Sequence, residues 1–298
     1  MNKRFRILTT AAFLLCTAAV TFISCDKDDD PTPEPEMVAT SIELVSGDSQ
    51  TAFAGEALSN AIEVIVKDQL GAAFAGEVVK FTVTEGSAST ANVTTDANGK
   101  ASITWTLGDT EGTQTLSITG TSTLTGSPIS VTATAEYKPV IGDFKYGGVI
   151  FYIDETGKSG LVCAVTDQST GTSWGCEGTE ITGAEGTAIG TGVQNTVDIE
   201  ADCTEVGTAA DLCANLSLNG FDDWFLPSKD ELNEMYLNKA TINTTATANS
   251  GAVFAEDYSY WTSTEDNAVA AKTIDFSDGF ENGVLKSGLR YVRAIREF

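Results

Sequence analysis

The sequence predicts two folded parts in one chain, an all-β sandwich over residues 38–137 followed by an α+β domain over residues 138–298. Short segments of the first part alternate apolar and polar residues between turn-forming residues, which is typical of β-strands. The second part mixes strand-like segments with apolar residues at helical spacing. The 298 residues are 42% hydrophobic, which is enough for packed cores in two domains.

Residues 1–24 are predicted to be a secretory signal. Basic residues near the N-terminus precede an apolar run that is too short and too interrupted by threonine for a spanning helix. The run closes on Phe22-Ile23-Ser24-Cys25, which resembles a lipoprotein signal-peptidase box. This resemblance implies that Cys25 becomes the acylated first residue of the mature chain. Plain secretion with a spare cysteine is the alternative.

Residues 25–37 are predicted to be an extended tether. The segment from Asp26 to Glu36 contains six acids and three prolines, so it cannot bury a core. An acidic run directly after the acylated cysteine resembles the surface-export signal of gut-type Gram-negative lipoproteins. The resemblance implies anchoring in the outer membrane with the folded parts exposed at the cell surface. A solvated spacer on a periplasm-facing protein is the alternative.

The alternating segments of residues 38–137, such as Ile62–Val66, predict an immunoglobulin-like sandwich of about seven strands. Trp105 lies in one of them, which favours a core position over a ligand platform. Two motifs, Val79-Lys80-Phe81-Thr82-Val83 and Thr94-Thr95-Asp96-Ala97-Asn98-Gly99, resemble bacterial Ig-like domains of the invasin/intimin type. The resemblance implies a stalk that holds another domain away from the membrane.

Residues 138–298 predict a strand pair, two helices and further strands. The strands are expected at 148–153, 161–165, 260–262, 272–276 and 291–298. Apolar residues at helical spacing predict a helix from Ala209 to Leu216. Ser228 and Glu231 form a capping box, which predicts a second helix after Pro227. Elements in this order make an α+β domain.

Several motifs of this part resemble the Lcl C-terminal domain family. They include Gly220-Phe221-Asp222-Asp223-Trp224-Phe225-Leu226-Pro227-Ser228, Tyr260-Trp261-Thr262-Ser263-Thr264-Glu265 and Val292-Arg293-Ala294-Ile295-Arg296. The resemblance implies a C-type-lectin-like fold and extracellular ligand binding. The adhesin that names the family binds sulfated glycans, but residues 138–298 hold 25 acids against 10 basic residues, which repel a polyanion. A neutral glycan or a protein is therefore the expected ligand.

The four cysteines of residues 138–298 predict two disulfides, because an even number in an exported domain favours cross-links. Three pairings are open. We favour Cys176–Cys203, which closes a Gly/Thr-rich segment, and Cys163–Cys213, which joins a strand to the first helix. A metal or redox site is disfavoured, because the sequence has no CxxC pair and no histidine.

The ligand-binding residues are expected on loops, because loops on a rigid scaffold usually carry recognition. The lectin-like resemblance places the binding face between the second helix and the final strand. The aromatic and amide side chains there are Tyr258, Tyr260, Asn267, Phe280 and Asn282. Aromatic rings beside short polar groups suit both sugar and protein recognition. Ordinary turn chemistry is the alternative for these residues.

Calcium is the one cofactor that the acids suggest, and no metal site is assigned. Asp222 and Asp223 would bind calcium with Asp230 or Glu265, because hard cations prefer several carboxylates. The Glu-Pro-Asn and Gln-Pro-Asp motifs of sugar-binding C-type lectins do not occur. Capping and surface charge are the favoured roles of most of these acids.

Charge and composition restrict the function. The net charge of −25 disfavours nucleic acid and anionic membrane surfaces as partners. Without histidine the chain lacks the usual general base, so an enzyme is not expected. The leading hypothesis is a lipid-anchored surface adhesin or ligand-binding protein that presents a lectin-like head to an extracellular glycan or protein. The alternatives are a non-catalytic accessory lipoprotein of a surface glycan-uptake complex and a carboxylate-dependent glycoside hydrolase.

Overall fold

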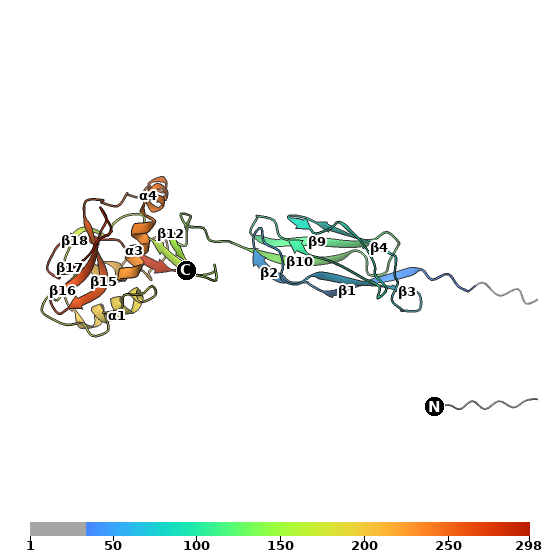
Figure 1. Cartoon of the computed structure of the whole chain (residues 1–298), viewed down its shortest axis with the longest axis horizontal. Helices are drawn as coiled ribbons and strands as arrows, with labels where there is room; N and C mark the ends of the chain where they lie inside the picture. The colour runs from blue at the N-terminus through green and yellow to red at the C-terminus, as the bar shows by residue number, and fades with distance from the viewer. Residues whose placement is uncertain (1–33) are drawn as a thin grey trace, which may run out of the picture.

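The computed structural model describes residues 34–298 as two bodies that follow one another along the long axis (Figure 1). The N-terminal body consists of strands, and the C-terminal body combines strands with four helices. The predicted signal peptide and Cys25 lie outside the described residues. Within residues 34–298, the structure has no helix of the length and apolar character that crossing a membrane requires.

The N-terminal body is a sandwich of two main sheets. Its strands are β1 Ala39–Ser46, β2 Gln50–Phe53, β3 Ile62–Asp68, β4 Val78–Val83, β5 Ser87–Ala88, β6 Asn92–Thr94, β7 Lys100–Ile103, β8 Trp105–Thr106, β9 Gly112–Gly120 and β10 Ile129–Glu136. One sheet has the order β1-β3-β7, the other has the order β2-β10-β9-β4-β6, and β5 pairs with β8.

Alternation along the strands produces the sandwich core. Ile62, Val64 and Val66 on β3 are fully buried, as is Trp105, whose Nε1 donates to the carbonyl of Glu85 at 3.4 Å. The predicted all-β immunoglobulin-like fold is confirmed for this part of the chain, and Trp105 is a core residue. The alternation of apolar and polar residues therefore indicates correctly which face of each strand is buried in the core.

The C-terminal body contains the remaining elements. They are β11 Phe144–Lys145, β12 Gly148–Ile153, β13 Gly160–Cys163, β14 Ser169–Thr172, α1 Gly192–Asp202, α2 Ala209–Ala214, α3 Lys229–Leu237, α4 Lys239–Ala248, β15 Ser259–Asn267, β16 Ala270–Asp275, β17 Glu281–Leu285, β18 Arg290–Val292 and β19 Ile295–Glu297. A sheet of order β11-β12-β13-β19 lies toward the sandwich, and a sheet of order β14-β18-β15-β16-β17 lies farther away (Figure 1). Helix α3 contacts both sheets, and α1 packs on β15 and α2.

The sequence predicts two of the four helices. Helix α3 begins at the expected capping box, in which Ser228 Oγ accepts from the Glu231 N–H and the Glu231 carboxylate accepts from the Ser228 N–H. Helices α1 and α4 are not predicted, because threonine and glycine weaken the helical signal around them. In α4 the hydroxyls of Thr244 and Thr247 donate to carbonyls four residues earlier, which satisfies them within the helix.

The closing segment, expected as one strand, is divided between the two sheets. Strand β18 pairs with β14 and β15, whereas β19 pairs with β13. Arg296 on β19 forms two hydrogen bonds with the Asp223 carboxylate, at 2.6 and 2.7 Å. Its guanidinium also lies 3.9 Å from the centroid of the Phe221 ring. The two arms of this bidentate contact join the C-terminus to the segment before α3.

The junction between the two bodies contains three lysine–glutamate pairs. They are Lys138–Glu56 at 2.7 Å, Lys145–Glu111 at 2.8 Å and Lys158–Glu136 at 3.2 Å. The junction also contains a hollow of about 560 Å³ lined in part by Phe53, Tyr137 and Tyr146. Because these ion pairs are exposed, each contributes little, and the contact between the bodies is weaker than either core.

One of the two expected disulfides is present. Cys176 and Cys203 are joined, with their Cα atoms 5.7 Å apart. The expected Cys163–Cys213 disulfide is wrong, because both residues are free and buried. Cys163 packs in a cluster with Phe151, whereas Cys213 packs in a different cluster on α2. Sequence spacing does not show which core cluster a cysteine packs in. Cys163 and Cys213 remain unpaired because they pack in different clusters.

The free cysteines lead to a prediction about thiol reactivity in a soluble chain of residues 34–298. Burial raises the pKa of the Cys163 thiol to about 12 and also raises that of Cys213, so neither forms a thiolate readily. We expect no reaction of the native chain with a disulfide reagent at about pH 8. Two thiols should react after unfolding without reductant. A count of zero after unfolding would restore the second disulfide.

The Asp223–Arg296 pair leads to a prediction about pH. Hydrogen bonds from Arg296 hold the pKa of the Asp223 carboxyl below its ordinary value of 3.8. The pair therefore stabilises the fold above that value, and the stabilisation is lost as the pH falls through the lower folded-state pKa. At pH 7 we expect Asp223→Asn to unfold at a lower urea concentration than the wild type. The difference should vanish by about pH 2, and a difference of constant size would argue against the ion pair as its cause.

Candidate functional site

The candidate ligand site is a pocket of about 410 Å³ on the sheet farther from the sandwich, here called the distal pocket. It is lined by Thr170, Gly171, Asp257, Tyr258, Ser259, Asp275, Leu289, Arg290 and Tyr291. These residues come from the regions of β14, β15, β16 and β18, which the sheet brings together from distant parts of the chain. A concave site with aromatic walls and a few polar groups is typical of ligand pockets.

A chain of packed aromatic rings connects the distal pocket to the core. Tyr258, which is 56% exposed, packs against Tyr291 with ring centroids 5.0 Å apart. Tyr291 packs against the buried Tyr260 at 5.3 Å, and Tyr260 lies 4.5 Å from Phe276 and 5.4 Å from Phe254. The outer rings are therefore supported from below. A supported ring loses little freedom when a ligand stacks on it.

The distal pocket is lined by both an acidic residue, Asp275, and a basic residue, Arg290. Asp275 accepts hydrogen bonds from the Ser277 N–H at 2.9 Å, the Ser277 hydroxyl at 2.6 Å and the Ser259 hydroxyl at 3.2 Å. The Ser277 hydrogen bonds, with a smaller contribution from the charge of Arg290, hold the pKa of Asp275 below its ordinary value. The carboxylate is therefore a charged, oriented acceptor at neutral pH, beside a guanidinium donor.

Tyr260 is a core residue, which corrects its prediction as a ligand contact. Its side chain is fully buried, because β15 begins at Ser259 and Tyr260 belongs to the strand rather than to the loop. The hydroxyl of Tyr260 donates to Asp167 at 3.2 Å and accepts from the Ala255 N–H at 2.9 Å. Arg293 Nε donates to the same Asp167 carboxylate at 2.7 Å. This buried network supports the pocket from the core side.

The other predicted ligand residues lie outside the distal pocket, apart from Tyr258. Asn267 Oδ1 accepts from the N–H groups of Val269 and Ala270, which closes the turn between β15 and β16. Asn282 lies on β17 and is partly buried. Phe280 is 62% exposed but does not line the pocket. Turn chemistry accounts for Asn267, and Phe280 is an exposed aromatic residue outside the distal pocket.

Asp275, Arg290 and Tyr291 are among the pocket residues that the sequence reasoning misses. Asp275 and Arg290 stand at the ends of strands, and Tyr291 lies within the closing segment. The one available signal is the Ser277-Asp278-Gly279 turn, which indicates that Asp275 is close to a loop. Nothing in the local sequence shows that β18 lies beside β15, because these strands are separated by two others along the chain.

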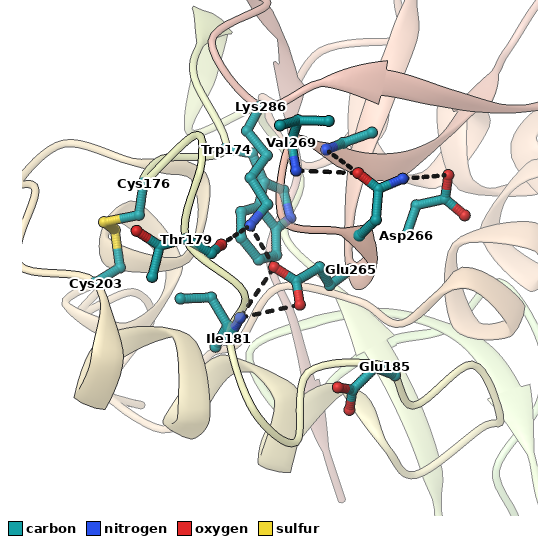
Figure 2. Close-up of polar contacts among 12 residues, drawn as sticks. Trp174, Cys176, Thr179, Ile181, Glu185, Cys203, Glu265, Asp266, Val269 and Lys286 are labelled. Atoms are coloured by element: carbon teal, nitrogen blue, oxygen red, sulfur yellow. Dashed lines mark hydrogen bonds and ion pairs between the residues drawn. A yellow bond between two sulfur atoms is a disulfide. The ribbon is translucent and has the colours of Figure 1, made fainter.

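A buried ion pair holds the Gly/Thr-rich segment against the sheet that carries the distal pocket (Figure 2). Lys286 and Glu265 are paired with each other, and both side chains are excluded from solvent. Lys286 Nζ also donates to the carbonyl of Thr179 at 2.7 Å and lies 4.5 Å from the centroid of the Trp174 ring. The Glu265 oxygens accept from the Ile181 N–H at 3.0 and 3.1 Å. Each charge therefore has several partners, as a buried charge requires.

The same segment is also secured by the disulfide (Figure 2). Cys203 is the C-cap residue of α1, so its bond to Cys176 joins the segment to the end of that helix. Trp174 and Ile181 are fully buried although they lie between β14 and α1, where the structure has no helix or strand. Covalent and ionic contacts thus order a segment whose composition favours neither regular structure.

The carboxylates suggested for calcium do not come together in the described part of the chain. Asp223 pairs with Arg296, Glu265 pairs with Lys286, and Asp230 lies 3.0 Å from Lys229. Within residues 34–298, the group with metal-type ligands in mutual reach is Cys176, Cys203 and Glu205. Because its two cysteines form the disulfide, this group has no thiolate to offer a metal.

The buried pair leads to a prediction about stability. Lys286→Met leaves Glu265 as a buried charge without a counter-ion, so we expect a loss of about 3–5 kcal/mol in the free energy of unfolding. The double variant Lys286→Met/Glu265→Gln should recover part of the loss, because the uncompensated charge is gone. Lys272→Met is the control: its partly exposed pairs with Asp266 and Glu281 predict a change below about 1 kcal/mol. Urea unfolding that gives equal losses for both lysine variants would contradict this account.

Two family models match adjacent parts of the chain. The Lcl C-terminal domain model matches residues 163–296, which confirms the resemblance for that part. The Macroglobulin domain MG4 model matches residues 53–140, in the sandwich. No curated protein matches the chain.

Solved structures with similarity to the chain include surface proteins of bacteria. The D0-D1 domain of intimin is 28% identical over 34% of this chain and 48% of that chain, with a TM-score of 0.24. A fimbrial protein from Bacteroides ovatus is 13% identical over 86% of this chain and 70% of that chain, with a TM-score of 0.42. The Yersinia pseudotuberculosis adhesin InvE is 13% identical over 85% of this chain and 70% of that chain, with a TM-score of 0.32. The matched part spans about half the length of the intimin chain.

Proposed function

We propose that this chain is a lipid-anchored, non-catalytic cell-surface protein that binds an extracellular glycan or protein through the distal pocket. Cys25 is the proposed anchor, the sandwich is the stalk, and the C-terminal body is a C-type-lectin-like head. Strand β1 begins at the end of the sandwich that lies opposite the C-terminal body (Figure 1). An anchor before β1 would therefore hold the head away from the membrane.

The observation that carries the proposal is the Tyr258–Tyr291 ring pair beside Asp275 and Arg290. Aromatic faces stack on the apolar faces of sugar rings and on apolar peptide side chains. The carboxylate and the guanidinium add an acceptor and a donor for hydroxyl or amide groups. This combination in one hollow supplies both the apolar contact and the orientation that recognition needs.

The charge of the distal pocket favours a neutral ligand. Asp257 and Asp275 line it together with one cation, Arg290. The surrounding domain has 25 acids against 10 basic residues, so a sulfated glycan meets a repulsive field. Because the protein's own side chains supply the donor and the acceptor in this pocket, we propose that binding requires no calcium.

Asp275 does not suit the role of general acid in glycoside hydrolysis. A general acid of a glycoside hydrolase needs a raised pKa so that it holds a proton at the working pH. The Ser277 hydrogen bonds instead hold the pKa of Asp275 below its ordinary value. A carboxylate kept charged in this way acts as a hydrogen-bond acceptor for a bound ligand.

A glycan array probed with residues 34–298 tests the proposal. We expect reproducible binding to neutral glycans, and at least about a tenfold loss in affinity for Tyr258→Ala, because the outer ring of the platform is removed. Phe280→Ala is the matched control, since it removes an exposed aromatic residue that does not line the distal pocket. Absence of any hit would count against a glycan, and hits that survive Tyr258→Ala would place the site elsewhere.

A further inference from the structure

A second hollow, here called the α1 groove, lies between α1 and the segment that precedes α3. It has a volume of about 450 Å³, and it is formed by α1, the end of α2 and residues 223–225. None of the residues that line it also lines the distal pocket. The α1 groove is therefore a separate surface of the C-terminal body, and the proposed function leaves it unused.

The walls of the α1 groove are mostly apolar. Val193 and Val197, one helical turn apart on α1, are 38% and 54% exposed. Beneath them Trp224 and Phe225 are buried and form the floor. Exposed aliphatic side chains beside a hollow with an aromatic floor lose unfavourable contact with water when a partner covers them.

Acids outnumber basic residues around the α1 groove. Residues 159–228, which include α1 and α2, contain 11 acids and no Lys or Arg. Arg296 neutralises Asp223 at the edge of the groove, whereas Glu200 has no ion-pair partner within residues 34–298. Partial burial, with a smaller contribution from Asp211, raises the pKa of Glu200, so its charge is costly until a cation approaches.

We propose that the α1 groove binds a basic segment of another polypeptide, with one large apolar side chain in the hollow and a Lys or Arg against Glu200. The volume is large enough to admit a large apolar side chain, and Val193 and Val197 add exposed apolar surface at its wall. A second copy of this chain is a poor occupant, because two chains of net charge −25 repel each other. An anionic membrane surface is disfavoured by the same field.

Selection of random dodecapeptides on residues 34–298, which contain both folded bodies, tests the proposal. We expect the selected peptides to combine a net positive charge with a large apolar residue. Their affinity should fall about tenfold for Val197→Asp, because the introduced acid sits on the apolar wall. Val253→Asp is the matched control, since Val253 is 56% exposed and lies outside both hollows.

Glu200→Gln separates the charge from the packing. It leaves the apolar walls intact, so binding should weaken and lose part of its dependence on salt. Neutral or acidic peptides, or peptides whose affinity is unchanged in both Val197→Asp and Glu200→Gln, would overturn the proposal. Self-association of the chain that Val197→Asp abolishes, measured by sedimentation, would assign the α1 groove to a second copy instead.

Discussion

The C-terminal body depends on the buried pair of Lys286 and Glu265. In a low-dielectric interior neither charge is tolerable alone, so each confines the other to one position. The pair also bonds to Thr179 and Ile181, which fixes a segment without helix or strand against β15. Strand β15 carries both Glu265 and Ser259, and Ser259 lines the distal pocket. The contact that orders the segment therefore also stabilises the sheet that carries the candidate site.

Local sequence patterns predicted those elements whose intrinsic preferences agree with the way they pack in the structure. The alternation in β3 reflects a strand with one buried side, and the Ser228–Glu231 capping box marks the start of α3 without tertiary information. Helices α1 and α4 escape prediction because their stability comes from packing on the sheets, not from propensity. The same limit applies to Cys163 and Cys213, whose separation depends on which of two cores each strand or helix enters.

The candidate site was less predictable than the fold, because it is assembled by strand order. Tyr258 was accessible to sequence reasoning, since it lies in a loop before a strand. Tyr260, two residues later, is inside the strand and serves the core. Arg290 and Tyr291 reach the distal pocket only because β18 lies in the sheet between β14 and β15, an order that the linear sequence does not contain.

The distribution of charge distinguishes the two hollows of the C-terminal body. The distal pocket contains Arg290, which offsets part of its acidic lining and leaves a site suited to neutral groups. At the α1 groove, Arg296 is committed to Asp223 by two hydrogen bonds, and Glu200 has no ion-pair partner within residues 34–298. A strongly acidic surface usually discourages association, and it becomes selective where apolar side chains interrupt it: a partner must then supply both positive charge and apolar surface. One acidic domain can in this way present two surfaces with different requirements for their ligands.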